Sequence, residues 1–335
     1  MRRFPTTGLM LALCVLMLGC RATGSTPPIP INAVQPQRFH FRDGGSALFY
    51  RLDKHLAPAF ATSGRTAIEA PESIMFFVAG SGCASMQYFL PRYFDGMEGE
   101  SGALRILLLQ KRFIDVRSWD RNGAPCSAQF GRADHLSRWL ADQAEFMVSE
   151  LGALQRAGQL PHRIILAGVS EGAELVPLLA RMVPGVTQVV MISNGGMHPL
   201  AVYRAQQSAM AGTRAPLAME SGQPIVPMAV LPPPADPDAP AAQFGGRSWR
   251  YWYELQALTH IDNLLALEMP LFVAVGSADM TVPVASAYFL HAQFLLHHKV
   301  NLHLTIYPGA DHGLKTNSHI NLSDFWFNFD RAIAK

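Results

Sequence analysis

The stretch ILAGVSEGAEL, residues 165–175, decides the fold of this chain. An apolar run ends at Gly168, and a lone serine, Ser170, precedes Gly172 where a buried strand meets a helix. One interpretation is a turn too tight for a side chain on either side of the serine, which exposes a nucleophilic hydroxyl at the top of a sheet. The other is an ordinary turn with a serine near the helix N-cap. The rest of the chain must decide between them.

Apolar runs alternate with amphipathic ones on both sides of this stretch. Buried strands are predicted at 73–80, 104–110, 163–170, 186–193, 270–277 and 300–309. Helices are predicted at 134–158, 171–183, 283–299 and 321–335, with a proline-broken helix at 85–97 and a hairpin at Gly44-Gly45. This alternation predicts an α/β fold with a doubly wound, mostly parallel sheet. Reactive groups are expected at the carboxyl ends of its strands.

Three residues with complementary chemistry stand at such strand ends. Ser170 lies in GVSEG, Asp279 in GSADMTVP and His312 in PGADHGL. The order Ser, Asp, His resembles the α/β-hydrolase superfamily over about residues 38–335. His312 would act as the base for the Ser170 hydroxyl, and Asp279 would orient the imidazole. Two other acids are candidates of lower rank, Asp311 beside the histidine and Asp262 before its strand.

The resemblance also implies two backbone donors for an oxyanion. One is the N–H of Glu171, directly after the nucleophile. The other comes from the loop AGSGCAS, residues 79–85, where Ser81 or Gly82 would supply it; Ala79 replaces the family's frequent histidine. Glu171 and Glu174 are interpreted as favouring the helix N-terminus, and binding of a cationic end of the substrate is the alternative.

The N-terminal 20 residues have the pattern of an export signal. Two arginines precede an apolar run that ends before Gly19 and is too short to span a membrane. MLGC resembles the lipobox of bacterial lipoproteins, which implies lipid on Cys20 and a place in the cell envelope, in the periplasm or at the outer membrane. A plain signal is the alternative. Residues 21–37 are predicted to be a tether, followed by a hydrolase domain at 38–335.

Two cysteines remain in the exported domain, Cys83 and Cys126. An even pair in an exported protein favours a disulfide, with two buried thiols as the alternative. The bridge would clamp the loop at 79–85 to the loop that ends at residue 126.

Composition excludes several classes of function. Charged residues make up 16% of the chain and the net charge is +2, which gives no footprint for nucleic acid and argues against disorder. No spacing among the histidines matches a zinc motif; the four considered are His291, His297, His298 and His303. No metal or organic cofactor is expected, and the oligomeric state is open.

Residues 196–268 form an insertion between two core strands, and in this superfamily such an insertion covers the active site as a lid. A dense aromatic group lies within it, which includes Trp249, Trp252 and Tyr253. These residues are interpreted as an apolar wall of the substrate pocket or as a small satellite core.

The predicted function is a serine hydrolase that cleaves carboxylic esters through an acyl-enzyme at Ser170. A peptidase of the prolyl-oligopeptidase-like kind and a thioesterase are alternatives with the same catalytic residues. The alternative without catalysis is an envelope lipoprotein that only binds a ligand on this fold. Partners would then be a small ester or acyl substrate and, through the lipid, a membrane.

Overall fold

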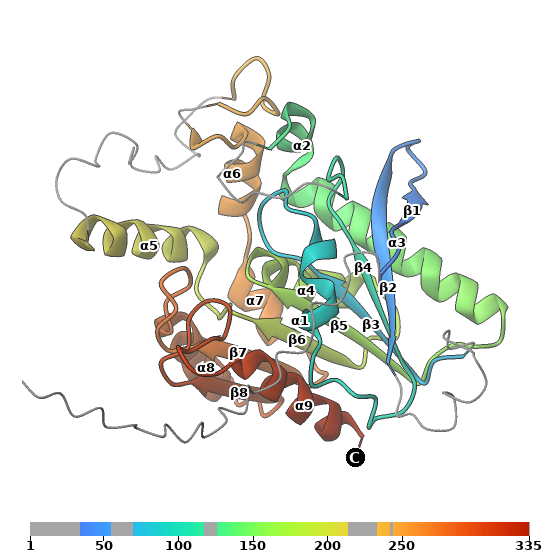
Figure 1. Cartoon of the computed structure of the whole chain (residues 1–335). Coiled ribbons are helices and arrows are strands. Elements are labelled where there is room, and N and C mark those ends of the chain that lie inside the picture. The colour runs from blue at the N-terminus through green and yellow to red at the C-terminus, as the bar shows by residue number, and fades with distance from the viewer. Residues whose placement is uncertain (1–33, 55–69, 117–125, 214–232, 242–243, 335) are drawn as a thin grey trace, which may run out of the picture. The chain divides into compact units, whose positions relative to one another are not determined.

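The structure is a computed structural model that describes residues 34–54, 70–116, 126–213, 233–241 and 244–334 (Figure 1). The predicted signal at 1–20, its Cys20 and residues 21–33 of the tether lie outside these ranges. They therefore stay predictions. Within the described ranges, no helix is both long and apolar enough to cross a membrane.

One eight-stranded sheet runs through the described chain in the order β1-β2-β4-β3-β5-β6-β7-β8. Its first two strands pair antiparallel with their neighbours, and all other pairs are parallel. The strands are β1 (Gln37–His40), β2 (Ser46–Lys54), β3 (Ser73–Val78), β4 (Leu104–Leu109), β5 (Arg163–Val169), β6 (Gln188–Ile192), β7 (Leu271–Gly276) and β8 (Leu302–Tyr307). The predicted α/β fold with a mostly parallel sheet is confirmed.

Helices cover both faces of the sheet because its central strands are apolar on both sides. Every residue of β3 and β4 is buried. One face packs against α3 (Leu136–Arg156), α4 (Glu171–Met182), α7 (His260–Leu265) and α8 (Ala285–Leu296). The other packs against α1 (Leu90–Tyr93) and α9 (Asn321–Ile333), where Trp326 is fully buried. This is the doubly wound arrangement that the alternation of strands and helices predicted (Figure 1).

Two predicted helices differ from their expected bounds in the structure. The segment at 85–97 forms a 3-10 helix, Met86–Tyr88, and then α1, which begins just before Pro91. The helix predicted at 134–158 begins later, at Leu136, because His135 caps α3 by accepting from Arg138 N–H. A separate helix, α2 (Ala128–Ala133), precedes it. Asp134 therefore lies in the short connection between α2 and α3. There its carboxylate accepts a hydrogen bond from Lys111.

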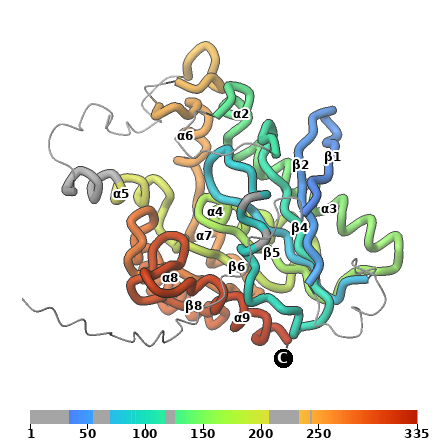
Figure 2. The backbone as a smooth tube through the Cα atoms, in the orientation of Figure 1, coloured from blue at the N-terminus to red at the C-terminus, as the bar shows by residue number. Residues whose placement is uncertain are grey.

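The insertion between β6 and β7 divides into two parts. It runs out through α5 (Pro199–Thr213) and α6 (Trp249–Gln256) and returns through α7 (Figure 2). Leu264 and Leu267 belong to the main core, so α7 and the turn after it are part of the body of the domain. The described parts of the insertion that lie near the carboxyl ends of the strands are thus α5, α6 and the segment before α6.

His260 fastens the returning part of the insertion to the end of β6. Its side chain is buried, and Nε2 lies 2.8 Å from the carbonyl oxygen of Gly195. Nε2 donates this bond, and Nδ1 is buried with no hydrogen-bond partner among the described residues, as expected of a neutral imidazole. Burial lowers the pKa of His260 to about 4.

This pKa predicts a loss of stability on the acidic side. The unfolded chain binds a proton at His260 near pH 6.5 and the folded chain only near pH 4, so stability falls as the pH falls through that window. Between pH 7 and pH 5 the contribution is about 2 kcal/mol. The free energy of unfolding, measured in urea, should therefore change between pH 7 and pH 5 by about 2 kcal/mol less in His260→Gln than in the wild type. Equal pH dependence of the two proteins would contradict it.

Candidate active site

Ser170 stands in the turn between β5 and α4 with a strained backbone, at φ 52° and ψ −124°. A non-glycine residue with positive φ costs free energy, of order 1–3 kcal/mol, and is retained where its surroundings enforce it. Here they do. A Cβ on Gly168 would lie 2.5 Å from the carbonyl oxygen of Gly172, and a Cβ on Gly172 would lie 2.2 Å from that of Ala79. Ser170 is the N-cap residue of α4 by position, but its side chain makes no capping hydrogen bond to the helix.

The three residues from three strand ends form one hydrogen-bonded chain. Ser170 Oγ lies 3.0 Å from His312 Nε2, and His312 Nδ1 lies 2.7 Å from Asp279 Oδ2. Asp279 is buried, and its other oxygen accepts from the N–H of Thr281 and Val282 at 2.7 and 2.9 Å. A carboxylate held in this way fixes Nδ1 as the protonated nitrogen and leaves Nε2 to accept from the serine.

Neither competing acid is hydrogen-bonded to His312 in the described part of the chain. Asp311 Oδ1 accepts from the N–H of Gly313 and Lys315, so it shapes the loop that carries His312 and does not contact the ring. Asp262 lies in the first turn of α7. The geometry thus selects Asp279 as the partner of His312.

Two polar residues after β6 complete the support of these groups. Ser193, itself at φ 54°, donates from Oγ to the backbone carbonyl of His312 at 2.7 Å. Asn194 donates from Nδ2 to the carbonyl of Ser170 at 2.9 Å. The sequence analysis did not identify either of them, because a Ser-Asn pair after a strand has no motif. Their position at the carboxyl end of a parallel strand was the available signal.

The loop at 79–85 lies beside Ser170, as expected. A Cβ on Gly80 would lie 3.3 Å from Ser170 Cβ, and Ser81 and Gly82 line the space in front of the serine. The N–H groups of Ser81, Gly82 and Glu171 donate no hydrogen bond within the part of the chain that the structure describes. These donors are therefore available to an oxygen placed next to Ser170.

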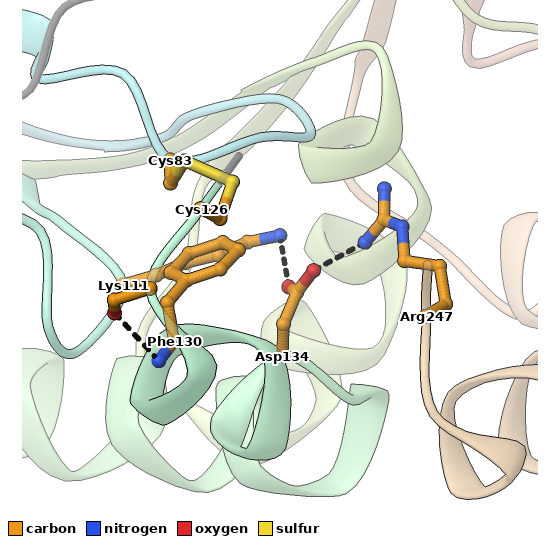
Figure 3. The surroundings of a disulfide bond; sticks show 7 residues. Cys83, Lys111, Cys126, Phe130, Asp134 and Arg247 are labelled. Carbon is orange, nitrogen blue, oxygen red and sulfur yellow. Dashed lines mark hydrogen bonds and ion pairs between the residues drawn. A yellow bond between two sulfur atoms is a disulfide. The ribbon is translucent and has the colours of Figure 1, made fainter. Parts of the chain in front are cut away.

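Cys83 and Cys126 form a disulfide (Figure 3). It connects the loop at 79–85 to the residue that precedes the N-cap of α2. Lys111 and Asp134 lie close by in Figure 3, with the Asp134 carboxylate between Lys111 and Arg247. The bridge thus joins the loop beside the serine to the segment that carries Asp134.

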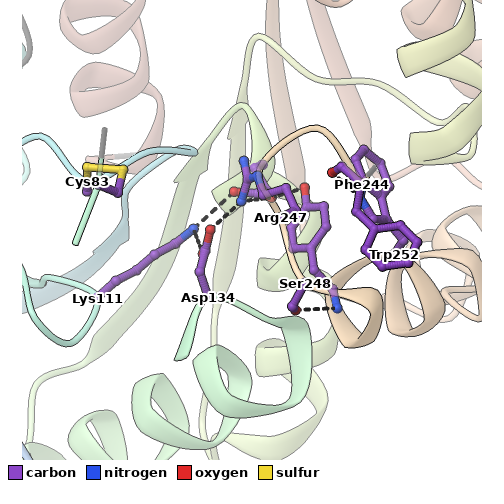
Figure 4. A network of polar contacts seen from close by, with 10 residues as sticks. Cys83, Lys111, Asp134, Phe244, Arg247, Ser248 and Trp252 are labelled. Carbon is purple, nitrogen blue, oxygen red and sulfur yellow. Dashed lines mark hydrogen bonds and ion pairs between the residues drawn. A yellow bond between two sulfur atoms is a disulfide. The ribbon is translucent and has the colours of Figure 1, made fainter. Parts of the chain in front are cut away.

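A buried network of charges links this segment to the insertion (Figure 4). Lys111 Nζ lies 2.7 Å from Asp134 and 3.0 Å from Glu171, and it stands 3.7 Å from the centre of the Trp139 ring. Arg247, from the insertion, pairs with Asp134 and lies 3.8 Å from Glu171. The hydroxyl of Tyr251 donates to Glu171. The sequence analysis identified none of these pairings.

The network shifts the pKa values of the two glutamates of α4 in opposite directions. Burial alone would raise the pKa of Glu171, but Lys111 and Arg247 outweigh it, and the pKa is lowered to about 2. The pKa of Glu174 is raised well above its ordinary value, first by burial and then by the charge on Glu171. Glu171 is therefore a carboxylate with a structural role, whereas burial makes ionisation of Glu174 unfavourable.

Two cavities meet at Ser170. One has a volume of about 340 Å³ and is mainly apolar; its walls are Ala84, Met86, Phe89, Tyr93 and Ile114, with His312 at the edge. The other has a volume of about 330 Å³ and is more polar; Glu174, Asn194, Tyr203, Arg247, Tyr251 and Trp252 line it. A molecule bound at the serine can thus extend into two chemically different spaces.

The aromatic residues of the insertion do not all reach these cavities. Of Trp249, Trp252 and Tyr253, only Trp252 lines one. Trp249 is buried in a satellite cluster with Leu200 and Leu255, and Tyr253 stacks on it with half of its surface exposed. Trp252 belongs to the same satellite cluster and also reaches the cavity, whereas Trp249 and Tyr253 do not line it. The satellite-core interpretation holds for Trp249, and Tyr251 joins Trp252 at the cavity.

No group of metal-binding side chains gathers within the described residues. His291, His297, His298 and His303 are all exposed, the first three on α8 or just after it and the last on β8. Their positions agree with solvated faces.

Comparison with solved structures identifies the fold. Est1E from Butyrivibrio proteoclasticus is 15% identical, with a TM-score of 0.53 over 89% of this chain and 98% of that chain. A soluble variant of monoglyceride lipase from Saccharomyces cerevisiae is 15% identical, with a TM-score of 0.52 over 91% and 96%. Acylaminoacyl peptidase from Pyrococcus horikoshii is 11% identical, with a TM-score of 0.53 over 89% of this chain and 41% of that longer chain.

The chain thus has the α/β-hydrolase fold. No protein-family model matches it, and no curated protein matches it either.

The position of the disulfide predicts a large effect on stability. The bridge closes a loop across a sequence separation of 43 residues, for which loop closure corresponds to about 4 kcal/mol. Cys83→Ser/Cys126→Ser should lower the free energy of urea unfolding by that order and increase hydrogen exchange at 79–85. Reductant should have the same effect on the wild type and none on the variant. Non-reducing peptide mapping that finds both cysteines unpaired would refute it.

Proposed function

We propose that the chain is a serine hydrolase that cleaves carboxylic esters by acyl transfer through Ser170. One observation carries the proposal: the continuous hydrogen-bonded chain from Ser170 through His312 to Asp279, with 3.0 Å and 2.7 Å links. A serine hydroxyl is a weak nucleophile and needs a base within hydrogen-bond reach at the moment of attack. A protein that only bound a ligand would have no need of that chain, nor of the strain at Ser170.

In the proposed reaction, His312 Nε2 takes the proton from Ser170 Oγ as the hydroxyl attacks the ester carbonyl. Asp279 stabilises the imidazolium and keeps its charge, because two backbone N–H groups already hold the carboxylate. His312 then gives the proton to the leaving alkoxide. Water repeats the sequence on the acyl-enzyme and releases the acid.

The negative charge on the former carbonyl oxygen would be stabilised by backbone donors on both sides of Ser170. The N–H of Glu171 is at the positive end of α4, and the loop at 79–85, whose Ser81 and Gly82 line the cavity at Ser170, would supply the second N–H. Removal of one donor from such a site typically costs about 10²–10³ in kcat.

Esters are favoured over peptides by the neighbours and by the leaving group. Est1E and monoglyceride lipase match over nearly their whole length, whereas the chain spans 41% of the acylaminoacyl peptidase. An alkoxide leaves more readily than an amine and requires less proton transfer from His312. The apolar cavity beside Ser170 and His312 would take a hydrocarbon arm.

We expect a fluorophosphonate probe to label Ser170, and Ser170→Ala to abolish both labelling and turnover of p-nitrophenyl butyrate. Asp279→Asn should lower kcat by about 10⁴, because the wrong tautomer of His312 is then favoured. Asp311→Asn is the matched control and should cost less than tenfold, since its carboxyl does not touch the ring. Labelling at another serine, or equal losses in the two aspartate variants, would overturn the assignment.

The apolar cavity predicts a preference for chain length. Each methylene buried there adds about 0.8 kcal/mol, so kcat/KM should rise about threefold to fourfold per carbon until the cavity is full. Two series of esters show which part of the substrate occupies the cavity: in one the acyl chain varies in length, and in the other the alcohol does. Ala84→Phe, which fills part of this cavity, should move the optimum to shorter chains. If kcat/KM does not change with chain length in either series, neither the acyl chain nor the alcohol binds in this cavity.

A further inference from the structure

The polar cavity beside Ser170 adjoins a cluster of charges in which carboxyl groups outnumber cations. Lys111 and Arg247 supply two positive charges, and Asp134 and Glu171 supply two negative ones within 4 Å of them. The charges of these four groups balance, and Figure 4 shows Lys111, Asp134 and Arg247 of this set. Glu174 is a further carboxyl group, which lines the polar cavity together with Glu171 and Arg247.

Glu174 has no cationic partner of its own. Among the described residues it forms no ion pair, and it lines the cavity beside Asn194. Asn194 donates to the Ser170 carbonyl, so a direct neighbour of the strained turn lies in the same cavity as Glu174. A partly buried carboxyl without a cation is costly to ionise, in agreement with its raised pKa.

Part of the wall of this cavity is aromatic. Tyr203 and Trp252 pack edge to face with ring centres 5.0 Å apart, and Tyr251 and Trp252 do the same at 4.9 Å. All three residues line the cavity. Aromatic faces attract cations, and a carboxylate opposite them supplies the counter-charge. The positive charge of Arg247 opposes a cation only weakly, because Asp134 and Glu171 compensate it.

We propose that Glu174 is a specificity-determining residue that binds a positively charged ammonium group of the substrate in this cavity. The inference rests on the proposed function for the identity of the reaction, and it deepens that function by naming a class of substrate. The ammonium group of the substrate would be the positive partner of the Glu174 carboxylate. Because Ser170 lines the same cavity, the ester carbonyl of a substrate bound in this way can lie at Ser170. Glu171 cannot take this role, because Lys111, Arg247 and Tyr251 already occupy it.

The test compares charged esters with uncharged esters of the same shape, on the full-length chain in detergent. One pair is 2-(trimethylammonio)ethyl butyrate and 3,3-dimethylbutyl butyrate, with the charge on the alcohol. The other is the p-nitrophenyl ester of 4-(trimethylammonio)butyrate and that of 5,5-dimethylhexanoate, with the charge on the acid. In one pair, the ratio of kcat/KM for the charged to the uncharged ester should fall at least tenfold in Glu174→Gln, mainly through KM.

Glu145→Gln is the matched control, because Glu145 lies on α3 and pairs with Arg42 at the surface, outside the cavity. It should leave both ratios unchanged. Ratios that are the same in the wild type and in Glu174→Gln for both pairs would overturn the proposal.

A binding measurement separates this proposal from the proposed function. Calorimetric titration of Ser170→Ala with benzyltrimethylammonium should show binding that weakens at least tenfold in Ser170→Ala/Glu174→Gln. If the wild type hydrolyses no ester and the probe does not label Ser170, the proposed function fails, and the titration alone decides the role of Glu174. If hydrolysis is found but no cation binds at millimolar concentration, the cation site is refuted and the hydrolase remains.

Discussion

The structure depends on the absence of a side chain at Gly172. The first turn of α4 lies against the end of β3 so closely that a Cβ there would be 2.2–2.4 Å from the carbonyl oxygens of Ala79 and Val78. This contact sets the distance between helix and sheet. It therefore also sets the height of Ser170 above the sheet and brings the N–H of Glu171 towards the loop at 79–85. The strain at Ser170 is retained because packing of the strand and helix requires it.

Much of this site could be predicted because its signals are local. Buried strands that end in glycine-containing junctions place Ser170, Asp279 and His312 at one edge of a parallel sheet. The choice between Asp279 and Asp311 follows from which backbone N–H groups each carboxylate accepts. The sequence could rank the two acids only by their distance from the histidine and by their position after a strand. The support from Ser193 required coordinates, since it acts through a backbone carbonyl.

The buried charges could not be predicted, and the reason is physical. Lys111, Asp134 and Arg247 come from three loops, and partners separated by 23 and 113 residues leave no periodic pattern in a sequence. Burial of one such charge alone would be costly, so the set must be complete to be stable. The network thereby ties the position of the insertion to the segment that the disulfide holds. Trp249 was ambiguous for a related reason, because a buried aromatic residue and one that lines a cavity look alike in sequence.

Glu171 and Glu174 show how tertiary neighbours, rather than local sequence, assign chemistry. Both belong to the first turn of the same helix, where the helix dipole favours a negative charge on each. Two cations and a phenol surround Glu171, which lowers its pKa, whereas an amide and a second carboxylate surround Glu174, and burial raises its pKa. Paired acids whose surroundings drive their pKa values apart divide the work between them. Here one acid fastens the insertion to the core, and the other lines the cavity beside Ser170 with no ion-pair partner among the described residues.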